Sequence, residues 1–166
     1  MYRWSVLIGI LFILVSAGCG GISEEEMVKQ TEAKAAKAFE AKAKKPTDEI
    51  KSGSFFVPEG YKVSSKQPNN VILTKDDRKH LLFINRNEPE DSKASYEALH
   101  GEYRKWLVDR TFEHDGGFGY VLVFKLKDEL YEVTAGNGGN KMTANAQKKD
   151  VPAAADEMIQ VLKSIR

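Results

Sequence analysis

The run YVLVFKL, from Tyr120 to Leu126, decides the fold of this chain. Its β-branched and aromatic residues favour a strand, in which successive side chains point to opposite faces of a sheet. The alternation predicts one face with Tyr120, Leu122, Phe124 and Leu126, and a second face with Val121 and Val123. Because both faces are apolar, we expect this strand to be covered on both sides.

Shorter strands are predicted on either side of this run. Each is a β-rich stretch bounded by turn residues, such as the polar turn from Lys75 to Arg78, the Gly116-Gly117 turn and the glycine-rich stretch from Gly136 to Asn140. The other expected strands cover residues 54–57, 61–64, 70–74, 80–85, 108–115, 130–135 and 141–144. The tight turns between them indicate antiparallel neighbours.

Two amphipathic helices are predicted to cover the sheet. The first runs from Ser92 to Leu107, and the second follows the capping residue Asp150 and ends near Ile165. Their apolar residues recur at three- and four-residue steps, which is typical of one buried helix face. These are Tyr96, Leu99, Tyr103, Trp106 and Leu107 in the first, and Val151, Ala155, Met158, Leu162 and Ile165 in the second. We therefore expect one globular α+β domain over residues 53–166, with a mainly antiparallel sheet.

A charged helix is predicted ahead of this domain, from Ser23 to Lys45, and Pro46 ends it. Ser23 and Glu26 have the spacing of a capping box. The only large apolar residues are Met27, Val28 and Phe39, which form no continuous stripe. We therefore expect residues 19–52 to be a solvated helical tether.

The N-terminus has the pattern of an export signal. Arg3 precedes an apolar run from Ser5 to Val15, which has the length of a signal core and is shorter than a membrane span. The segment Leu14-Val15-Ser16-Ala17-Gly18-Cys19-Gly20 resembles the lipobox of bacterial lipoproteins, although Ser16 stands where an aliphatic residue is usual. The resemblance implies a signal peptide over residues 1–18, cleavage between Gly18 and Cys19, and lipidation of Cys19. The alternative is an ordinary secretory signal that is cut nearby.

Lipidation would place the chain on the extracytoplasmic face of the cell membrane, held by its N-terminal lipid anchor. Residues 1–18 carry one charge, Arg3, so the mature chain has 24 basic and 24 acidic residues. This balance provides no basic field for a nucleic acid. The expected partners are therefore the membrane and an unknown protein or cell-envelope component.

Two segments of the domain resemble PsbP-like domains. They are the opening Phe55-Phe56-Val57-Pro58-Glu59-Gly60-Tyr61 and the ending Met158-Ile159-Gln160-Val161-Leu162-Lys163-Ser164-Ile165. The resemblance implies an α/β/α sandwich in a family whose members act mostly as binding or assembly factors. No residues here correspond to a metal or photosynthetic site of that family.

The sequence contains no recognisable catalytic or cofactor-binding motif. His80, His100 and His114 lack the spacing of a zinc motif, and the adjacent Asp76 and Asp77 suit a hairpin turn better than an acid/base pair. The glycine-rich stretch at 136–140 lacks the Lys and Ser/Thr of a P-loop. We therefore predict no catalytic residues, no metal, no cofactor and no enzyme activity.

Three functions remain open at this stage. The leading hypothesis is a lipid-anchored, non-catalytic binding or assembly module. The second is a small-ligand or metal-binding lipoprotein, which requires His80, His100 and His114 to share one cleft. The third is an extracytoplasmic hydrolase, for which a pocket with a strongly perturbed histidine or carboxylate would be the signature.

Overall fold

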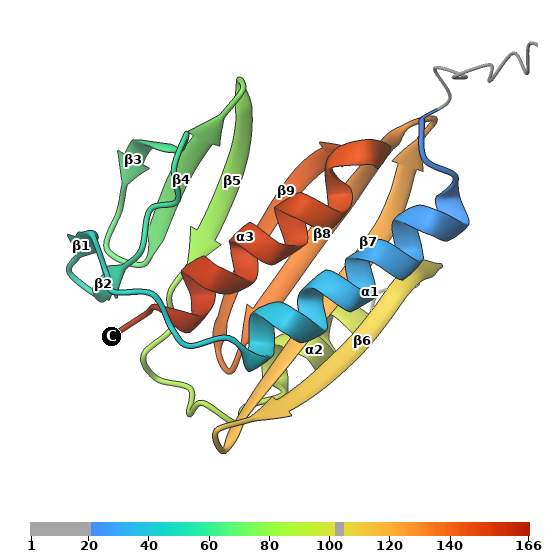
Figure 1. The fold of residues 1–166 in the computed structure, drawn as a ribbon. Helices are drawn as coiled ribbons and strands as arrows, with labels where there is room; N and C mark the ends of the chain where they lie inside the picture. Colours follow the sequence, from blue (N-terminus) through green and yellow to red (C-terminus); the bar gives the residue numbers. More distant parts are fainter. Residues whose placement is uncertain (1–20, 102–104) are drawn as a thin grey trace, which may run out of the picture.

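Residues 21–101 and 105–166 are described by the computed structural model, and this part of the chain forms three α-helices and nine strands (Figure 1). The helices are α1 (Glu24–Glu40), α2 (Ala94–His100) and α3 (Val151–Lys163), with a 3-10 turn at Lys148–Asp150. The strands are β1 (Asp48–Ile50), β2 (Gly53–Phe55), β3 (Lys62–Lys66), β4 (Asn70–Lys75), β5 (Arg78–Phe83), β6 (Trp106–His114), β7 (Gly117–Lys127), β8 (Leu130–Asn137) and β9 (Asn140–Gln147).

The main sheet has seven strands in the order β3-β4-β5-β9-β8-β7-β6, and every neighbouring pair is antiparallel. β1 and β2 form a separate antiparallel pair. The C-terminal residue joins this pair, because the Arg166 and Ser54 backbones exchange two hydrogen bonds of 3.1 Å. The prediction of an α+β chain with a mainly antiparallel sheet is confirmed.

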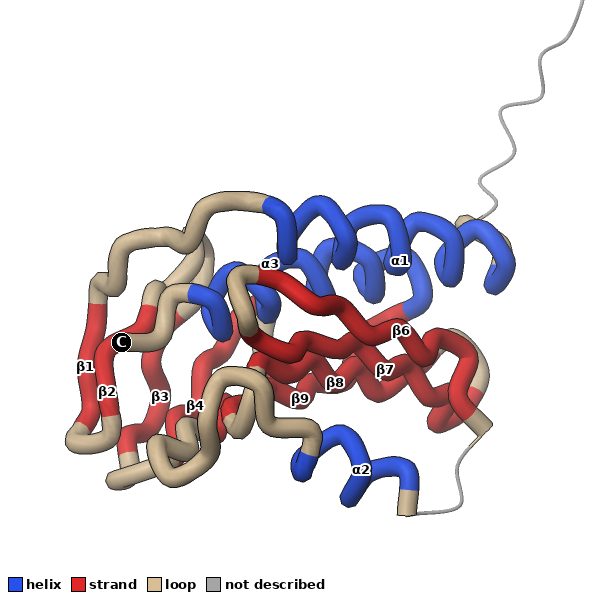
Figure 2. Tube along the Cα trace, turned by 90° about the horizontal axis from the view of Figure 1, so that it is seen from below, coloured by secondary structure: helices blue, strands red, loops and turns tan. Residues whose placement is uncertain are grey.

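Helices cover the main sheet on both faces. α1 and α3 lie side by side on one face, and α2 lies against the other (Figure 2). Val121 and Val123 belong to the larger core under α1 and α3, whereas Tyr120 and Leu122 belong to a smaller core under α2. The two-sided burial of this strand is therefore confirmed. Leu126, expected to point inward, is 42% exposed because a β-bulge shifts the register at this point.

The predicted solvated tether over residues 19–52 is wrong for α1, which packs into the main core. Its buried stripe recurs at helical spacing and consists of Met27, Thr31, Ala35, Ala38 and Phe39. The small alanines let α1 approach α3 closely. Phe39 lies over Gly119, where a Cβ would come within 2.3 Å of the Phe39 ring. The globular part of the chain therefore begins before residue 53.

α1 begins as predicted and ends earlier than predicted. The Ser23 hydroxyl accepts a hydrogen bond from the Glu26 backbone N–H at 3.0 Å, which caps the first turn. The helix ends at Glu40, where the Lys163 ammonium donates to the carbonyls of Ala38, Phe39 and Ala41 and so satisfies acceptors that have no helical donor. Partial burial at this site lowers the pKa of Lys163.

The predicted helix from Ser92 to Leu107 is also wrong at its C-terminal end. α2 covers only Ala94–His100, and Trp106 and Leu107 belong to β6. Trp106 pairs with Phe124 of β7 and still packs on the small core with Tyr96 of α2. The aromatic residues therefore meet in one cluster without sharing one helix. Tyr103 lies outside the described residues.

Candidate functional site

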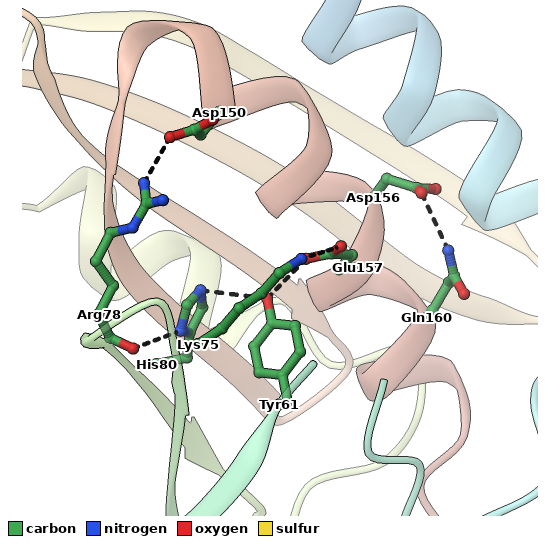
Figure 3. Close-up of polar contacts among 8 residues, drawn as sticks. All are labelled: Tyr61, Lys75, Arg78, His80, Asp150, Asp156, Glu157 and Gln160. Carbon is green, nitrogen blue, oxygen red and sulfur yellow. Dashed lines mark hydrogen bonds and ion pairs between the residues drawn. The ribbon is translucent and has the colours of Figure 1, made fainter. Parts of the chain in front are cut away.

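A group of interacting polar side chains lies between the β4–β5 hairpin and α3 (Figure 3). We call it the Tyr61 cluster. It consists of Tyr61, Lys75, Arg78, His80, Asp150 and Glu157.

The hairpin turn places three of these side chains on the face that is covered by α3. Asp76 and Asp77 both have positive φ, 48° and 59°, which is the backbone of a tight two-residue hairpin turn. Lys75 and Arg78 flank the turn and face each other across the two strands. His80 follows Arg78 by two residues, so it shares the same face. The prediction that Asp76 and Asp77 form a hairpin tip is confirmed.

Two carboxylates, one at the N-terminal end of α3 and one within it, meet the two cations of the hairpin. Asp150 and Glu157 are seven residues apart, or two helical turns, so they lie on the same side of the helix. The Lys75 Nζ is 2.6 Å from the Glu157 Oε1, and the Arg78 Nη1 is 2.7 Å from the Asp150 Oδ2. Asp150 precedes α3 as predicted, but its side chain pairs with Arg78 and makes no cap hydrogen bond.

Tyr61 enters the cluster from the turn before β3. Gly60 adopts a φ of +82°, and the Tyr61 backbone N–H donates to the Pro58 carbonyl at 3.1 Å, which turns the Tyr61 side chain inward. Its hydroxyl donates to the Glu157 Oε2 at 2.8 Å. Burial and this hydrogen bond raise the pKa of Tyr61 well above its usual range, so the phenol stays protonated and remains a donor.

His80 is only 5% exposed and lies edge-on to the Tyr61 ring. Its Nε2 is 3.3 Å from the Tyr61 hydroxyl, and its Nδ1 is 3.3 Å from the Arg78 carbonyl. The hydroxyl proton already points to Glu157, and a neutral imidazole has one N–H, so His80 satisfies only one of these two contacts. Burial lowers the pKa of His80, which favours this neutral form.

This burial predicts a pH dependence of stability. Unfolded His80 takes up a proton near its ordinary pKa of 6.5, whereas folded His80 does so only at lower pH. The contribution to the free energy of unfolding is therefore fully present above about pH 6.5 and is lost as the pH falls toward the lower folded pKa, with a slope of at most about 1.4 kcal/mol per pH unit. Chemical denaturation between about pH 7.5 and 5 measures this slope.

The matched variants are His80→Gln and His100→Gln. His80→Gln should remove the part of the slope that begins near pH 6.5. His100 is partly exposed and lies by Asp109 on β6, so His100→Gln should keep that part. Equal slopes in the parent and in His80→Gln would show that His80 is protonated in the folded chain as easily as in the unfolded one.

The Tyr61 cluster encloses a small pocket of about 80 Å³. Sites for drug-sized ligands occupy roughly 300–1,000 Å³, so this pocket has room for a few atoms only. No serine, threonine or cysteine lines it within the described residues, and the side chains of Lys75, Arg78, Asp150 and Glu157 are engaged with each other. The geometry joins the hairpin to α3 and offers no positioned nucleophile.

The three histidines lie at separate places. His80 contacts Tyr61, His100 lies 3.3 Å from the Asp109 carboxylate, and His114 lies 3.0 Å from the Asn137 amide oxygen. Across residues 21–101 and 105–166, no group of three or more His, Cys, Asp and Glu side chains could hold a metal ion. The shared cleft that the metal-binding hypothesis requires is absent from this part of the chain.

The glycine-rich stretch from Gly136 to Asn140 is mostly strand. Gly136 and Asn137 end β8, Asn140 begins β9, and only two residues form the turn. A Cβ at Gly138 would come within 2.7 Å of the Pro89 carbonyl oxygen, so this glycine is required for close backbone packing. The turn predicted over residues 136–140 is therefore shorter than expected and tightly packed.

The lipidation and cleavage residues, Cys19 and Gly18, lie outside the described residues. The described helices include none that is long and apolar enough to cross a membrane.

The sequence analysis missed the Tyr61 cluster. Its clearest signal is the i, i+7 spacing of Asp150 and Glu157 on α3, opposite two cations three residues apart, Lys75 and Arg78. In the comparison with known proteins, no family model and no curated protein matches the chain.

Proposed function

We propose that this chain is a lipid-anchored bacterial lipoprotein on the extracytoplasmic face of the cell membrane, and that its domain is a non-catalytic module for binding or assembly. The observation that carries the proposal is Cys19, which follows an apolar N-terminal run and the small residues Ala17 and Gly18. The partner would be a protein or another component of the cell envelope.

The position of α1 supports a short connection between lipid and domain. Only Gly20 to Ser23 separate Cys19 from the first residue of α1. Four residues span at most about 14 Å when fully extended. Because α1 packs into the main core, a lipid on Cys19 would hold the domain close to the bilayer. A partner within reach would lie near the membrane surface.

We also propose that the domain is PsbP-like. The two segments that resemble this family have structural roles that fit the proposal. Phe55 is fully buried, Tyr61 follows the glycine turn, and the C-terminal segment forms the buried side of α3. Helices on both faces of an antiparallel sheet are compatible with the α/β/α sandwich of that family. Binding and assembly functions are what the resemblance implies.

The chemistry of the Tyr61 cluster suits a structural contact between the hairpin and α3 better than catalysis. Its charged groups are paired, and its pocket is small. A hydrolase remains a second candidate, because the pocket holds a buried histidine with a lowered pKa. Such an enzyme would need an incoming water as nucleophile. The only hydroxyl group in the described lining is the Tyr61 phenol, and its strongly raised pKa keeps it protonated.

Replacing Cys19 tests the anchor. Two acyl chains provide stable membrane retention at about 0.8 kcal/mol for each buried CH₂, and one chain is marginal. In a bacterial host, Cys19→Ser should abolish incorporation of labelled fatty acid and leave either an uncleaved precursor or a released protein. Ser16→Ala, three residues before Cys19, is the control and should still be labelled. Mass spectrometry should find the parent's N-terminal peptide beginning at a modified Cys19; an unmodified peptide that begins elsewhere would refute lipidation.

A further inference from the structure

A groove of about 510 Å³ lies where the C-terminal half of α1 and the segment after it meet α3. Five lysines and a single carboxylate line it, and we call it the basic groove. Its charged residues are Lys34, Lys37, Lys42, Lys44, Lys163 and Asp156.

Four of these lysines remain available to a ligand. Lys163 caps the C-terminus of α1, and Asp156 accepts a hydrogen bond of 3.0 Å from Gln160 (Figure 3). The other four side chains belong to exposed residues, and none forms an ion pair with another described residue. They therefore concentrate four positive charges on a chain whose total net charge is only +1.

The chemistry of the groove suits a polymer with repeated negative charges. Lysine is a compact, flexible point charge that binds phosphate without the bidentate geometry of arginine. Lys34 and Lys37 lie one turn apart on α1, and Lys42 and Lys44 extend the same charged surface beyond the helix. Four ammonium groups that line one groove can each meet a different phosphate of a polymer, whereas a single small anion would leave most of them unused.

We propose that the basic groove binds a phosphodiester-linked anionic polymer of the cell envelope. The choice of this polymer over anionic lipid rests on the proposed anchor at Cys19. The anchor is joined to the N-terminal end of α1, where Glu25 and Glu26 would be repelled by anionic headgroups, while Glu24 is paired with Lys125. At about 1.5 Å per residue, Lys34 lies about 15 Å from that end and the C-terminus of the helix about 25 Å, so the groove begins about two Debye lengths from the anchored end.

The test uses soluble protein, so it does not depend on the anchor. The chain is produced from residue 19 with Cys19→Ser; it keeps every described contact, since the described residues begin at Gly21. The probe is long-chain inorganic polyphosphate. The groove variant carries K34Q, K37Q, K42Q and K44Q. The matched control carries K62Q, K79Q, K105Q and K127Q, which are exposed lysines elsewhere and remove the same charge.

The parent should bind polyphosphate with a slope of log affinity against log salt concentration of about −0.7 per lysine–phosphate contact, or near −3 for four contacts. Between about 50 and 200 mM salt its affinity should therefore fall roughly 50-fold. The groove variant should lose at least tenfold in affinity at about 50 mM salt and most of the salt slope. The control should stay within about twofold of the parent. Equal binding by the parent and the groove variant, or an equal loss in the control, would overturn the proposal.

A second arm separates polymer from membrane. The same soluble proteins are mixed with vesicles of phosphatidylglycerol and phosphatidylcholine, and sedimentation measures the bound fraction. Weak vesicle binding that the groove substitutions do not change supports the polymer. Vesicle binding that is stronger than polyphosphate binding and is lost in the groove variant would assign the groove to the membrane instead. If the full chain proves to be unlipidated at Cys19 while the soluble protein still binds polyphosphate, the anchor is refuted and the groove is not.

Discussion

A chain that begins at Gly53 should fail to unfold cooperatively, because it lacks α1. Met27, Ala35, Ala38 and Phe39 of this helix are each at most 3% exposed and belong to the main core. Their removal would leave the neighbouring faces of α3, β6 and β7 open to water. We expect a broad thermal transition and strong binding of a hydrophobic dye, and a chain that begins at Gly21 should unfold as sharply as the parent.

A point substitution measures the same contribution within the full chain. Phe39 stacks on Phe112 of β6, with ring centroids 4.6 Å apart, and fills the space over Gly119. Phe39→Ala should lower the free energy of unfolding by about 3–5 kcal/mol. Lys29→Ala, at an exposed position of the same helix, should change it by about 0.5 kcal/mol or less. A sharp unfolding transition in the Gly53 chain, together with an unchanged free energy of unfolding for Phe39→Ala, would show that α1 is a solvated spacer.

The sheet and α3 were predictable because large apolar residues follow the period of each element. Val121 and Val123 alternate with Tyr120 and Leu122, and the structure buries the two sets in different cores. The helix at α1 was predicted, but its burial was missed for the opposite reason. Its buried stripe has the helical period, but Thr31, Ala35 and Ala38 are small, so hydropathy alone does not distinguish them from a solvated surface. The buried Thr31 hydroxyl donates to the Met27 carbonyl, which removes the cost of its burial.

The candidate site could not be predicted because its contacts join distant parts of the chain. Tyr61 and Glu157 are 96 residues apart, and Lys75 and Glu157 are 82 apart. In sequence, a lone glutamate within an amphipathic helix is typical of a solvated face. Only the register of β4 with β5, and the placement of α3 above them, show that Glu157 faces two partners. The same limit applies to Trp106. Its spacing from Tyr96 is that of a helix, but Trp106 begins strand β6.

Gly136→Ala should be the most damaging single-methyl change in the sheet. Gly136 of β8 pairs with Tyr120 of β7, and the Tyr120 ring lies across the space that a side chain at Gly136 would occupy. An added Cβ would lie 2.0 Å from the Tyr120 Cε1, far inside van der Waals contact. Because Tyr120 is fully buried, the ring has little freedom to move. We expect a loss of about 3 kcal/mol in the free energy of unfolding, at the upper end of the usual cost of overpacking.

A double-mutant cycle with Tyr120 identifies the cause of this loss. Tyr120→Leu removes the ring, so Gly136→Ala in that background should cost about 1 kcal/mol or less, which is a coupling of about 2 kcal/mol. Tyr120→Phe keeps the ring and should leave the full cost of Gly136→Ala in place. Alone, Tyr120→Phe should be neutral or stabilising, since the buried Tyr120 hydroxyl has no hydrogen-bond partner among the described residues. If Gly136→Ala costs the same in the Leu and Phe backgrounds, the β8 backbone and not the Tyr120 ring requires glycine at this position.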